Sequence, residues 1–477
     1  MSALDPERDE TSLNVLGGHS GTGSKRPPPS TSAPPPPPKS ASVSDAETTG
    51  QARRDRPAFP GDGVGPAAAQ ATGVAGVARR PDEAVPRPLR RFLALDDFVP
   101  AARQRLPRQI YGYYAGAAET NQSRDDNRRA FRDIAFVPTV LADVSRRSTA
   151  ATLFGQPYRF PFGISPMGLS GLACFEGDLV LARAARAEAI PMVVSATSIM
   201  RLERLAAEGG ARWFQAYLPG EPERIAAMVD RVAAAGFDTF VLTVDVPVPA
   251  NRENNTRTGF SIPLRPSLRL LLDGLTHPDW SVGTFARTLR AGMPHMENMD
   301  AHRGPPILSR DLVRAVGKRD GLSWDHVDLI RRRWRGRFVL KGVLSAADAA
   351  EAARRGVDAV WVSNHGGRQL DGALAPLHAL PAIKAAAGAM TVLFDSGVRR
   401  GTDVLKALAL GADFVFLGRP FLFAAAAAGE AGVRHAVGLL GAEVERDMAL
   451  LGVTDVGTLG PQHLCDAHPR LGSHGAD

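Results

Sequence analysis

One short segment combines a histidine and an arginine whose side chains could act together on an acidic small molecule. It reads Ser363-Asn-His-Gly-Gly-Arg-Gln-Leu-Asp371, so His365 and Arg368 stand three residues apart. An imidazole titrates close to neutral pH, which suits it to take a proton as a general base. A guanidinium presents a planar fork that matches a carboxylate. The pair therefore predicts proton removal from a carboxylate-bearing compound.

Two further segments have the composition of an anion site. Asp395-Ser-Gly-Val-Arg-Arg-Gly401 and Gly418-Arg419 combine glycines, which let backbone amides approach an anion, with arginines that neutralise it. They predict a phosphate-bearing cofactor or substrate. Lys341 ends another apolar run, where its ammonium could stabilise an anion on a cofactor ring or form a Schiff base. The residues alone leave both roles open.

Eight short apolar runs alternating with helical stretches must position these residues. Such runs indicate a parallel sheet buried on both faces, and eight of them indicate a closed (β/α)8 TIM barrel. An open doubly wound sheet is the alternative, but it needs a Gly-rich turn where this chain reads Pro166-Met167-Gly168. The runs are Phe162–Ser165, Met192–Ser195, Trp213–Tyr217, Thr239–Val244, Phe338–Lys341, Ala359–Ser363, Thr391–Asp395 and Phe414–Leu417, and helices are expected over 177–188, 222–235, 345–355, 376–387 and 401–410.

The residues that end these runs are mostly polar. In a barrel they gather at one mouth, where active sites of this fold lie. His365 is the histidine placed at such an end, whereas others, such as His277, His326 and His435, are expected on the surface or as helix caps. No set of metal ligands is predicted. The strand ends supply Pro166, Ser195, Gln215, Tyr217, Thr243, Asp245, Lys341, His365, Asp395 and Gly418-Arg419.

Two domains are predicted. Residues 1–85 are rich in Pro, Ser, Ala and Gly, and they are expected to be a disordered tail because they have too little apolar surface to fold. Residues 86–477 are expected to form the barrel domain, with a helix over 96–118. About 100 residues separate the fourth and fifth strands, so 246–322 must hold a long insertion after strand 4, including the apolar stretch Leu268–Leu275.

Charge, cysteine content and the N-terminal sequence argue against nucleic-acid-binding, disulfide-rich and secreted proteins. The 477 residues carry a net charge of +7, and residues 1–100 contribute none of it, with 12 Lys+Arg against 12 Asp+Glu. The folded part is therefore basic, but it lacks the clustered basic stripe and the signatures of a nucleic-acid-binding protein. Cys174 and Cys465 are too few for a disulfide framework. The acidic N-terminus is not a secretory signal, and no apolar run reaches 18 residues, which favours a cytoplasmic protein.

The motifs together resemble the FMN-dependent α-hydroxy acid oxidising enzymes, a family that includes glycolate oxidase, lactate dehydrogenases and mandelate dehydrogenase. The matching segments are Ser363 to Asp371, Leu340-Lys-Gly-Val343, Asp395 to Gly401 and Leu417-Gly-Arg-Pro420. The resemblance runs from about Leu89 to Leu464 and leaves the tail out. It implies a (β/α)8 barrel that binds FMN and oxidises (S)-2-hydroxy acids, of lactate or mandelate type, to 2-oxo acids.

The resemblance also implies a role for each matching residue. His365 would be the base, and Asp245 would orient its ring. Tyr113 and Arg368 would hold the substrate carboxylate, while Tyr217 and Arg252 would lie against the hydroxyl and carboxylate. Lys341 would lie by flavin N1, which displaces the Schiff-base alternative. The implied flavin site comprises Pro166, Met167, Gly168, Ser195, Gln215, Thr243, Lys341 and Ser363 at the ring, and Asp395, Ser396, Gly397, Val398, Arg399, Gly418 and Arg419 at the ribityl phosphate.

Two positions favour a dehydrogenase acting on a substrate larger than glycolate. Gly168 stands where oxidases of the family often carry Ala, and Gly accompanies enzymes that pass electrons to quinone or another carrier. Thr197 stands where glycolate oxidase has a Trp, which leaves room for lactate or an aryl 2-hydroxy acid. The alternative is an oxidase that uses O2 and produces H2O2. An isomerase of phosphorylated substrates and a barrel without catalysis are more distant alternatives, because neither explains His365 beside Arg368.

The long fourth loop, residues 253–322, resembles that of mandelate dehydrogenase, where it carries a membrane-binding segment. Here it has 10 Lys+Arg against 7 Asp+Glu and an apolar patch, which suits an anionic bilayer surface. A lid over the active site is the equal alternative. The resemblance thus implies peripheral contact with the inner face of the cell membrane, and also a homotetramer.

Overall fold

The computed structural model describes residues 85–263, 265, 267–309 and 319–467, so the predicted tail lies outside the described residues except for Val85. Before the barrel come α1 (Phe98–Arg105), α2 (Arg108–Ala115), α3 (Gln122–Arg129) and β1 (Ile134–Phe136). The single helix predicted over 96–118 is wrong. Leu106 is extended, because a residue that precedes proline is disfavoured in the helical region, and Pro107 therefore separates α1 from α2.

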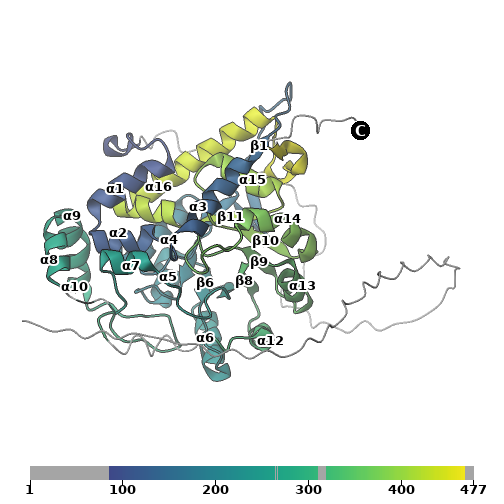
Figure 1. Ribbon diagram of the computed structural model, residues 1–477. Helices are drawn as coiled ribbons and strands as arrows, with labels where there is room; N and C mark the ends of the chain where they lie inside the picture. Colours follow the sequence, from purple (N-terminus) through teal and green to yellow (C-terminus); the bar gives the residue numbers. More distant parts are fainter. Residues whose placement is uncertain (1–84, 264, 266, 310–318, 468–477) are drawn as a thin grey trace, which may run out of the picture. The chain divides into compact units, whose positions relative to one another are not determined.

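Eight parallel strands form the predicted barrel (Figure 1). Their order is β4-β11-β10-β9-β8-β7-β6-β5, and a parallel bridge between Ile164 and Met192 joins β4 to β5, which closes the sheet. All eight predicted strands are confirmed to within two residues at each end. They are β4 (Phe162–Ile164), β5 (Val193–Ser195), β6 (Trp213–Ala216), β7 (Thr239–Thr243), β8 (Arg337–Val343), β9 (Ala359–Val362), β10 (Thr391–Phe394) and β11 (Phe414–Leu417).

A helix follows each strand and covers the outside of the barrel. The last is split by non-helical backbone at Ala428 and Gly429, and α1 packs against it (Figure 1). In order, the helices are α4 (Gly177–Ala187), α5 (Leu202–Gly209), α6 (Pro222–Ala234), α12 (Trp324–Arg333), α13 (Ala346–Arg354), α14 (Pro376–Ala387), α15 (Gly401–Ala409) and α16 (Arg419–Leu451).

Successive side chains along each strand point alternately into the barrel and out toward the helices. This alternation forms two apolar cores and sets the direction of the site residues. In β9, Ala359 and Trp361 belong to the cluster inside the barrel, whereas Val360 and Val362 pack outward against the helices. Since side chains two apart share a face of a strand, Ser363 continues the inward row. Lys341 continues the inward row of β8 in the same way, after Val339. The two-residue period of the strands therefore places the side chains of Ser363 and Lys341 inside the C-terminal mouth of the barrel.

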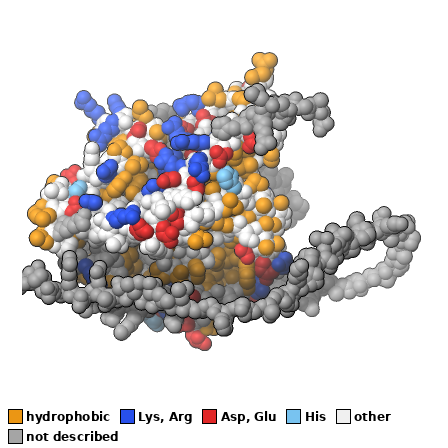
Figure 2. Space-filling view, viewed as in Figure 1, with side chains coloured by type: hydrophobic (Ala, Val, Ile, Leu, Met, Phe, Trp, Pro, Cys, Tyr) orange, Lys and Arg blue, Asp and Glu red, His pale blue; other side chains and the backbone are white. Residues whose placement is uncertain are grey.

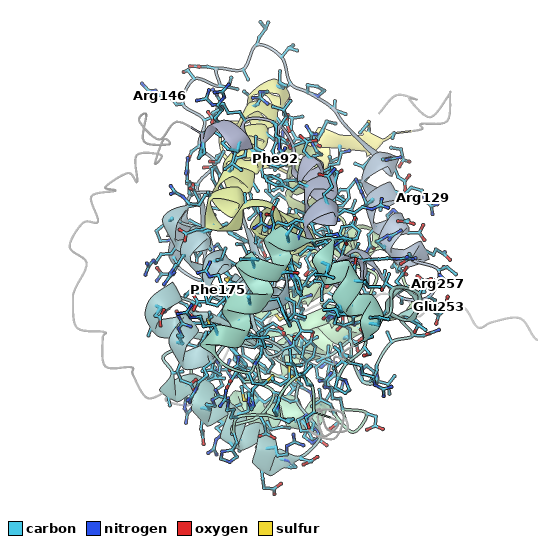
Figure 3. All side chains as sticks on the ribbon, turned by 90° about the vertical axis from the view of Figure 1, so that its left-hand side faces the viewer. Phe92, Arg129, Arg146, Phe175, Glu253 and Arg257 are labelled. Atoms are coloured by element: carbon cyan, nitrogen blue, oxygen red, sulfur yellow. The ribbon has the colours of Figure 1, made fainter. Side chains whose placement is uncertain are left out.

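The insertion after β7 contains α7 (Glu253–Thr258), α8 (Leu268–Leu275), α9 (Pro278–Trp280) and α10 (Arg287–Ala291), the last two joined by a π-helical turn over Ser281–Ala286. Figure 3 views the side on which these teal helices lie, with Phe175 among them. The Arg287 guanidinium lies 4.2 Å from the Phe175 ring centre, and buried Trp280 donates to the carbonyl of Leu172 at 2.8 Å. These contacts fix the insertion to the loop after β4.

Two small sheets complete the fold. The hairpin of β2 (Ala151–Leu153) and β3 (Gln156–Tyr158) supplies Leu153 to the cluster inside the barrel, and β12 (Leu464–Asp466) pairs with β1. None of the helices in the described part of the chain is long and apolar enough to span a bilayer.

Candidate active site

The C-terminal ends of the strands and the loops above them enclose a cavity of about 770 Å³. This volume lies in the upper part of the range for ligand sites. Four predicted residues, Ser195, Gln215, Asp245 and Ser363, lie outside the lining. The other predicted site residues all line the cavity: Tyr113, Pro166, Met167, Gly168, Tyr217, Thr243, Arg252, Lys341, His365, Arg368, Asp395, Ser396, Gly397, Val398, Arg399, Gly418 and Arg419.

His365 lies between a carboxylate and a phenol. Its Nδ1 is 3.0 Å from Asp245 Oδ1, and its Nε2 is 3.2 Å from the Tyr217 hydroxyl. Because a carboxylate only accepts hydrogen bonds, the neutral ring carries its proton on Nδ1 and leaves the Nε2 lone pair toward the cavity. The backbone of His365 is left-handed, with φ 59°, and its N–H donates to Ser363 Oγ at 3.0 Å. This turn after β9 holds the ring in place.

The electrostatic surroundings of His365 keep it neutral. Burial lowers its pKa below the usual 6.5, while Asp245 opposes the shift and Lys341 and Arg252 add to it. A neutral imidazole at physiological pH is the form that can accept a proton. The geometry and the pKa direction therefore leave Nε2 able to accept a proton.

Arg368 is held by the C-terminus of α2. Its Nη1 donates to the carbonyls of Tyr113 at 2.8 Å and Gly116 at 2.7 Å, which have no partners within the helix. Its guanidinium also lies 5.0 Å from the Tyr113 ring centre. Burial and then Arg252 lower the pKa of Arg368 to about 10, so it stays charged at neutral pH. Arg419 binds the same helix end, donating to the carbonyls of Tyr114 and Gly116.

Arg252 is a second arginine that lines the cavity, beside Arg368. Its Nη2 donates to Gln369 Oε1 at 2.8 Å, and its Nε donates to the Arg368 carbonyl at 3.3 Å. Tyr113 stacks on Phe260, with ring centres 4.4 Å apart. Helix α2, the loop after β9 and the insertion thus bring Tyr113, Arg368 and Arg252 to the cavity, an arrangement that suits a carboxylate.

Lys341 is buried deep in the mouth and paired with a carboxylate. Its Nζ lies 2.9 Å from Asp395 Oδ2 and donates to Ser363 Oγ at 2.7 Å. Asp395 also accepts from the hydroxyls of Ser165 and Ser396. Burial alone would raise the pKa of Asp395, but Lys341 and the hydroxyls of Ser363 and Ser396 outweigh burial, and the pKa is lowered. The Asp395 carboxyl is therefore ionised at neutral pH.

Two polar atoms in β6 and β7 have no hydrogen-bond partner among the described residues. They are Gln215 Nε2 and Thr243 Oγ1, and both are buried. Ser195 donates to Gln215 Oε1 at 3.0 Å, which orients the amide. Because buried polar groups are ordinarily paired, these two atoms indicate a ligand with polar atoms near the ends of β6 and β7.

The loops after β10 and β11, which hold the residues predicted to bind an anion, line the cavity. Ser396 and Gly397 have φ values of 92° and 90°, and a Cβ at Gly397 would lie 2.3 Å from the Asn127 carbonyl oxygen. Arg399 reaches back to Asp96, with Nε 3.5 Å from Oδ1, and burial lowers its pKa to about 10. Arg400 instead pairs with Glu443 at 2.9 Å.

Several residues of this cavity were missed from the sequence. Phe260 and Arg319 come from the insertion, where no regular pattern marks them. Gln369 lies next to Arg368 in the segment Ser363–Asp371, but an amide side chain alone does not predict a role. The expectation for His435 is wrong, because it is buried and its Nε2 lies 3.0 Å from the Phe92 carbonyl. His326 does cap a helix, accepting from the Ser323 backbone.

Comparison with known proteins matches most of the described chain. The sequence profile of the family described as FMN-dependent dehydrogenase matches residues 102–466. The chain is 39% identical to (S)-mandelate dehydrogenase of Pseudomonas putida over 371 residues, which cover 78% of this chain and 93% of that protein. It is 37% identical to L-lactate dehydrogenase of Pectobacterium atrosepticum over 382 residues, which cover 79% and 98% of the two chains.

Solved structures agree with these relatives. A crystal structure of the monotopic membrane protein (S)-mandelate dehydrogenase superposes with a TM-score of 0.73 at 38% identity, covering 79% of this chain and 99% of that chain. A mandelate oxidase with benzoyl-formic acid superposes with a TM-score of 0.64 at 34% identity, covering 78% and 98%. The chain is therefore similar both to a dehydrogenase and to an oxidase.

Proposed function

The chain belongs to the FMN-dependent dehydrogenase family, and from this membership we propose that it oxidises (S)-2-hydroxy acids, of lactate or mandelate type, to 2-oxo acids. The observation that carries the proposal is the position of His365 Nε2, which faces the cavity with Asp245 behind the ring and two arginines beside it. A base beside a carboxylate clamp is what removal of a proton from a 2-hydroxy acid requires.

FMN is the cofactor of this family, and the cavity has the features that it needs. The buried atoms Gln215 Nε2 and Thr243 Oγ1 lack partners among the described residues, and a flavin ring carries carbonyl and nitrogen atoms that could pair with them. Arg399 lies in the glycine-containing loop of the anion site, which suits the ribityl phosphate. When bound, FMN supplies the acceptor for the two electrons of the oxidation.

The substrate is proposed to bind through its carboxylate. Arg368 and Arg252 would hold it, and the Tyr113 hydroxyl would add a hydrogen bond. Arg368 is already fixed by the carbonyls at the end of α2 and Arg252 by Gln369, so little side-chain entropy would be lost on binding. This clamp would place the second carbon of the substrate beside His365.

His365 would take one of the two protons that the substrate loses. The proton would arrive at Nε2, while Nδ1–H keeps its hydrogen bond to Asp245, whose negative charge stabilises the imidazolium. The Tyr217 hydroxyl, 3.2 Å from Nε2, would turn to the substrate hydroxyl. Lys341 supplies a buried positive charge that would favour negative charge on the reduced cofactor.

We propose a dehydrogenase that passes its electrons to quinone or another carrier. Gly168 supports this choice, because oxidases of the family often carry Ala at this position, and a Cβ here would lie only 2.2 Å from Thr197 Oγ1. The alternative is an oxidase that reduces O2 to H2O2, and it shares all of the residues above.

We also propose that the insertion contacts the inner face of the cell membrane. Leu268, Leu271, Leu272 and Leu275 of α8 are between 54% and 71% exposed, although they are large and apolar. Orange side chains show at the left-hand edge of Figure 2, where Figure 1 labels α8. The similar (S)-mandelate dehydrogenase is described as a monotopic membrane protein. The homotetramer stays a prediction.

The test is an anaerobic titration of the purified yellow protein. L-Lactate or (S)-mandelate should bleach the flavin absorbance, and readmitted air should restore the colour slowly for a dehydrogenase and rapidly for an oxidase. A His365→Asn variant should keep its flavin but bleach at least a hundredfold more slowly. Normal bleaching of that variant would refute the role of His365, and a yellow protein that no 2-hydroxy acid bleaches would refute the activity.

A further inference from the structure

Besides Arg252, the insertion brings a second arginine, Arg319, to the cavity. Arg319 stands where the chain returns from the insertion to α12, and its guanidinium lies 4.7 Å from the centre of the Tyr217 ring. It lines the main cavity and also a smaller adjoining cavity of about 290 Å³. Tyr217 therefore has His365 at its hydroxyl and Arg319 over its ring.

Arg319 differs from Arg252 and Arg368 in having no hydrogen bond or ion pair with the residues that the structure describes. Arg252 donates to Gln369 and Arg368 donates to backbone carbonyls. Arg319 Nε is buried and has no hydrogen-bond partner among the described residues. Burial lowers the pKa of Arg319 and Tyr217 raises it, and no carboxylate of the described residues pairs with this guanidinium.

A buried cation without a partner is costly, and proteins ordinarily pair it or use it. The apolar side chains of Val246 and Met299 line the same cavity. A guanidinium gains no hydrogen bond from an alkyl or aryl substituent, but it forms strong charge-assisted hydrogen bonds with an anion. The arrangement therefore calls for a ligand that brings negative charge to Arg319.

We propose that Arg319 binds a second carboxylate of the substrate, which makes 2-hydroxy dicarboxylic acids the preferred class. This inference rests on the proposed function. Arg252 and Arg368 would hold the carboxylate next to the hydroxyl-bearing carbon, and His365 would meet that carbon. The distal carboxylate would reach Arg319 past the ring of Tyr217. Arg319 is a specificity residue in this arrangement, and it takes no part in the proton transfer.

The experiment compares substrates of equal chain length that differ in the distal group. The anaerobic bleaching rate of the holoenzyme is measured with L-malate against (S)-2-hydroxybutyrate, and with (S)-2-hydroxyglutarate against (S)-2-hydroxyvalerate. Three variants accompany the wild type: Arg319→Met, Arg319→Lys and, as a matched control, Arg332→Met, which removes an exposed arginine of α12. Flavin content shows that each variant is folded, and dissociation constants of the 2-oxo acids provide a readout without turnover.

The wild type should bleach at least tenfold faster, at equal low concentration, with each dicarboxylate than with its monocarboxylate partner. Arg319→Met should lower that ratio by about ten- to a hundredfold, the effect of losing one charge-assisted contact. Arg319→Met should also weaken binding of the 2-oxo dicarboxylates and leave binding of the 2-oxo monocarboxylates unchanged. Arg319→Lys should keep part of the preference for dicarboxylates, and Arg332→Met should keep all of it.

Two results would overturn the inference. Monocarboxylates that bleach as well as dicarboxylates would leave the proposed function standing and remove the role of Arg319 in specificity. An equal loss for both classes in Arg319→Met would mean that Arg319 acts through Tyr217 as a positioning residue. If no acid of either class bleached the flavin, the proposed function itself would fail, and the inference with it.

Discussion

Asp245 and His365 meet across an intervening strand, with Oδ1 3.0 Å from Nδ1. Asp245 follows β7 and His365 follows β9, and β8 lies between them in the sheet. Gly342 of β8 makes this contact possible: its φ is 103°, and a Cβ on it would lie 2.6 Å from the Cβ of Asp245. The pair that supports the proposed base therefore depends on a residue without a side chain in the strand between.

Replacing Gly342 should disturb the base from a distance. Gly342→Ala would strain the backbone by about 1–3 kcal/mol and displace the Asp245 carboxylate, so the rate of flavin bleaching should fall at least tenfold. Gly356→Ala is the matched control, because Gly356 also has a positive φ, 71°, but open space around it. It should lower the free energy of unfolding and leave bleaching unchanged. Equal activity losses in both variants would contradict the role given to Gly342.

Asp245→Asn should change both the size and the pH dependence of the rate. The base works when neutral, and the pKa of His365 is already below 6.5, so kcat/KM should be flat above that pH and fall as pH drops through the lowered pKa. Removing Asp245 takes away the charge that raises this pKa. The acid limb should therefore move to still lower pH, while the plateau falls about a hundredfold. A limb that moves to higher pH would disprove this account.

Lys341→Met should destabilise the protein without its cofactor. The substitution leaves the Asp395 carboxylate buried without its cation, a change that costs about 3–5 kcal/mol. Burial would then raise the pKa of Asp395, so the deficit, measured by urea unfolding, should be largest at neutral pH and shrink as pH falls and the carboxyl is protonated. Adding Asp395→Asn should recover most of the loss. A deficit that does not change with pH would show that the charge is not its cause.

The apolar face of α8 should bind anionic vesicles. Leu271→Glu together with Leu272→Glu places two negative charges on that face, so co-sedimentation with phosphatidylglycerol vesicles should fall at least tenfold. Leu450→Glu is the control, because Leu450 is 69% exposed but lies on α16. Bleaching by substrate in solution should not change in either protein. Equal sedimentation of both would remove α8 from the proposed membrane contact.

The barrel could be predicted from the sequence because its strands are buried on both faces. Each is then a continuous apolar run, and polar residues such as Lys341 and His365 mark where it ends. The cavity residues follow from the topology, since all parallel strands end at the same mouth. The break between α1 and α2 at Pro107 could also be predicted, because a residue that precedes proline is disfavoured in the helical region.

Arg319 could not be predicted in the same way. It lies at the end of an insertion without a repeating pattern, and its position over Tyr217 depends on how that segment folds back onto the barrel. Nothing local distinguishes it from exposed neighbours such as Arg332. Similarly, the exposure of the leucines of α8 follows from which side of the helix meets the barrel, and the sequence shows only that the helix is apolar.

The bonds that hold the end of α2 also set an order of events during synthesis. The Gly116 carbonyl is bound by Arg368 and Arg419, which leave the ribosome 252 and 303 residues later. α1 likewise packs on α16, the last long helix. Helices α1 and α2 therefore cannot make these contacts until Arg368, Arg419 and α16 have been synthesised. A growing chain cannot complete the substrate clamp, and capture of the cofactor belongs to the finished polypeptide.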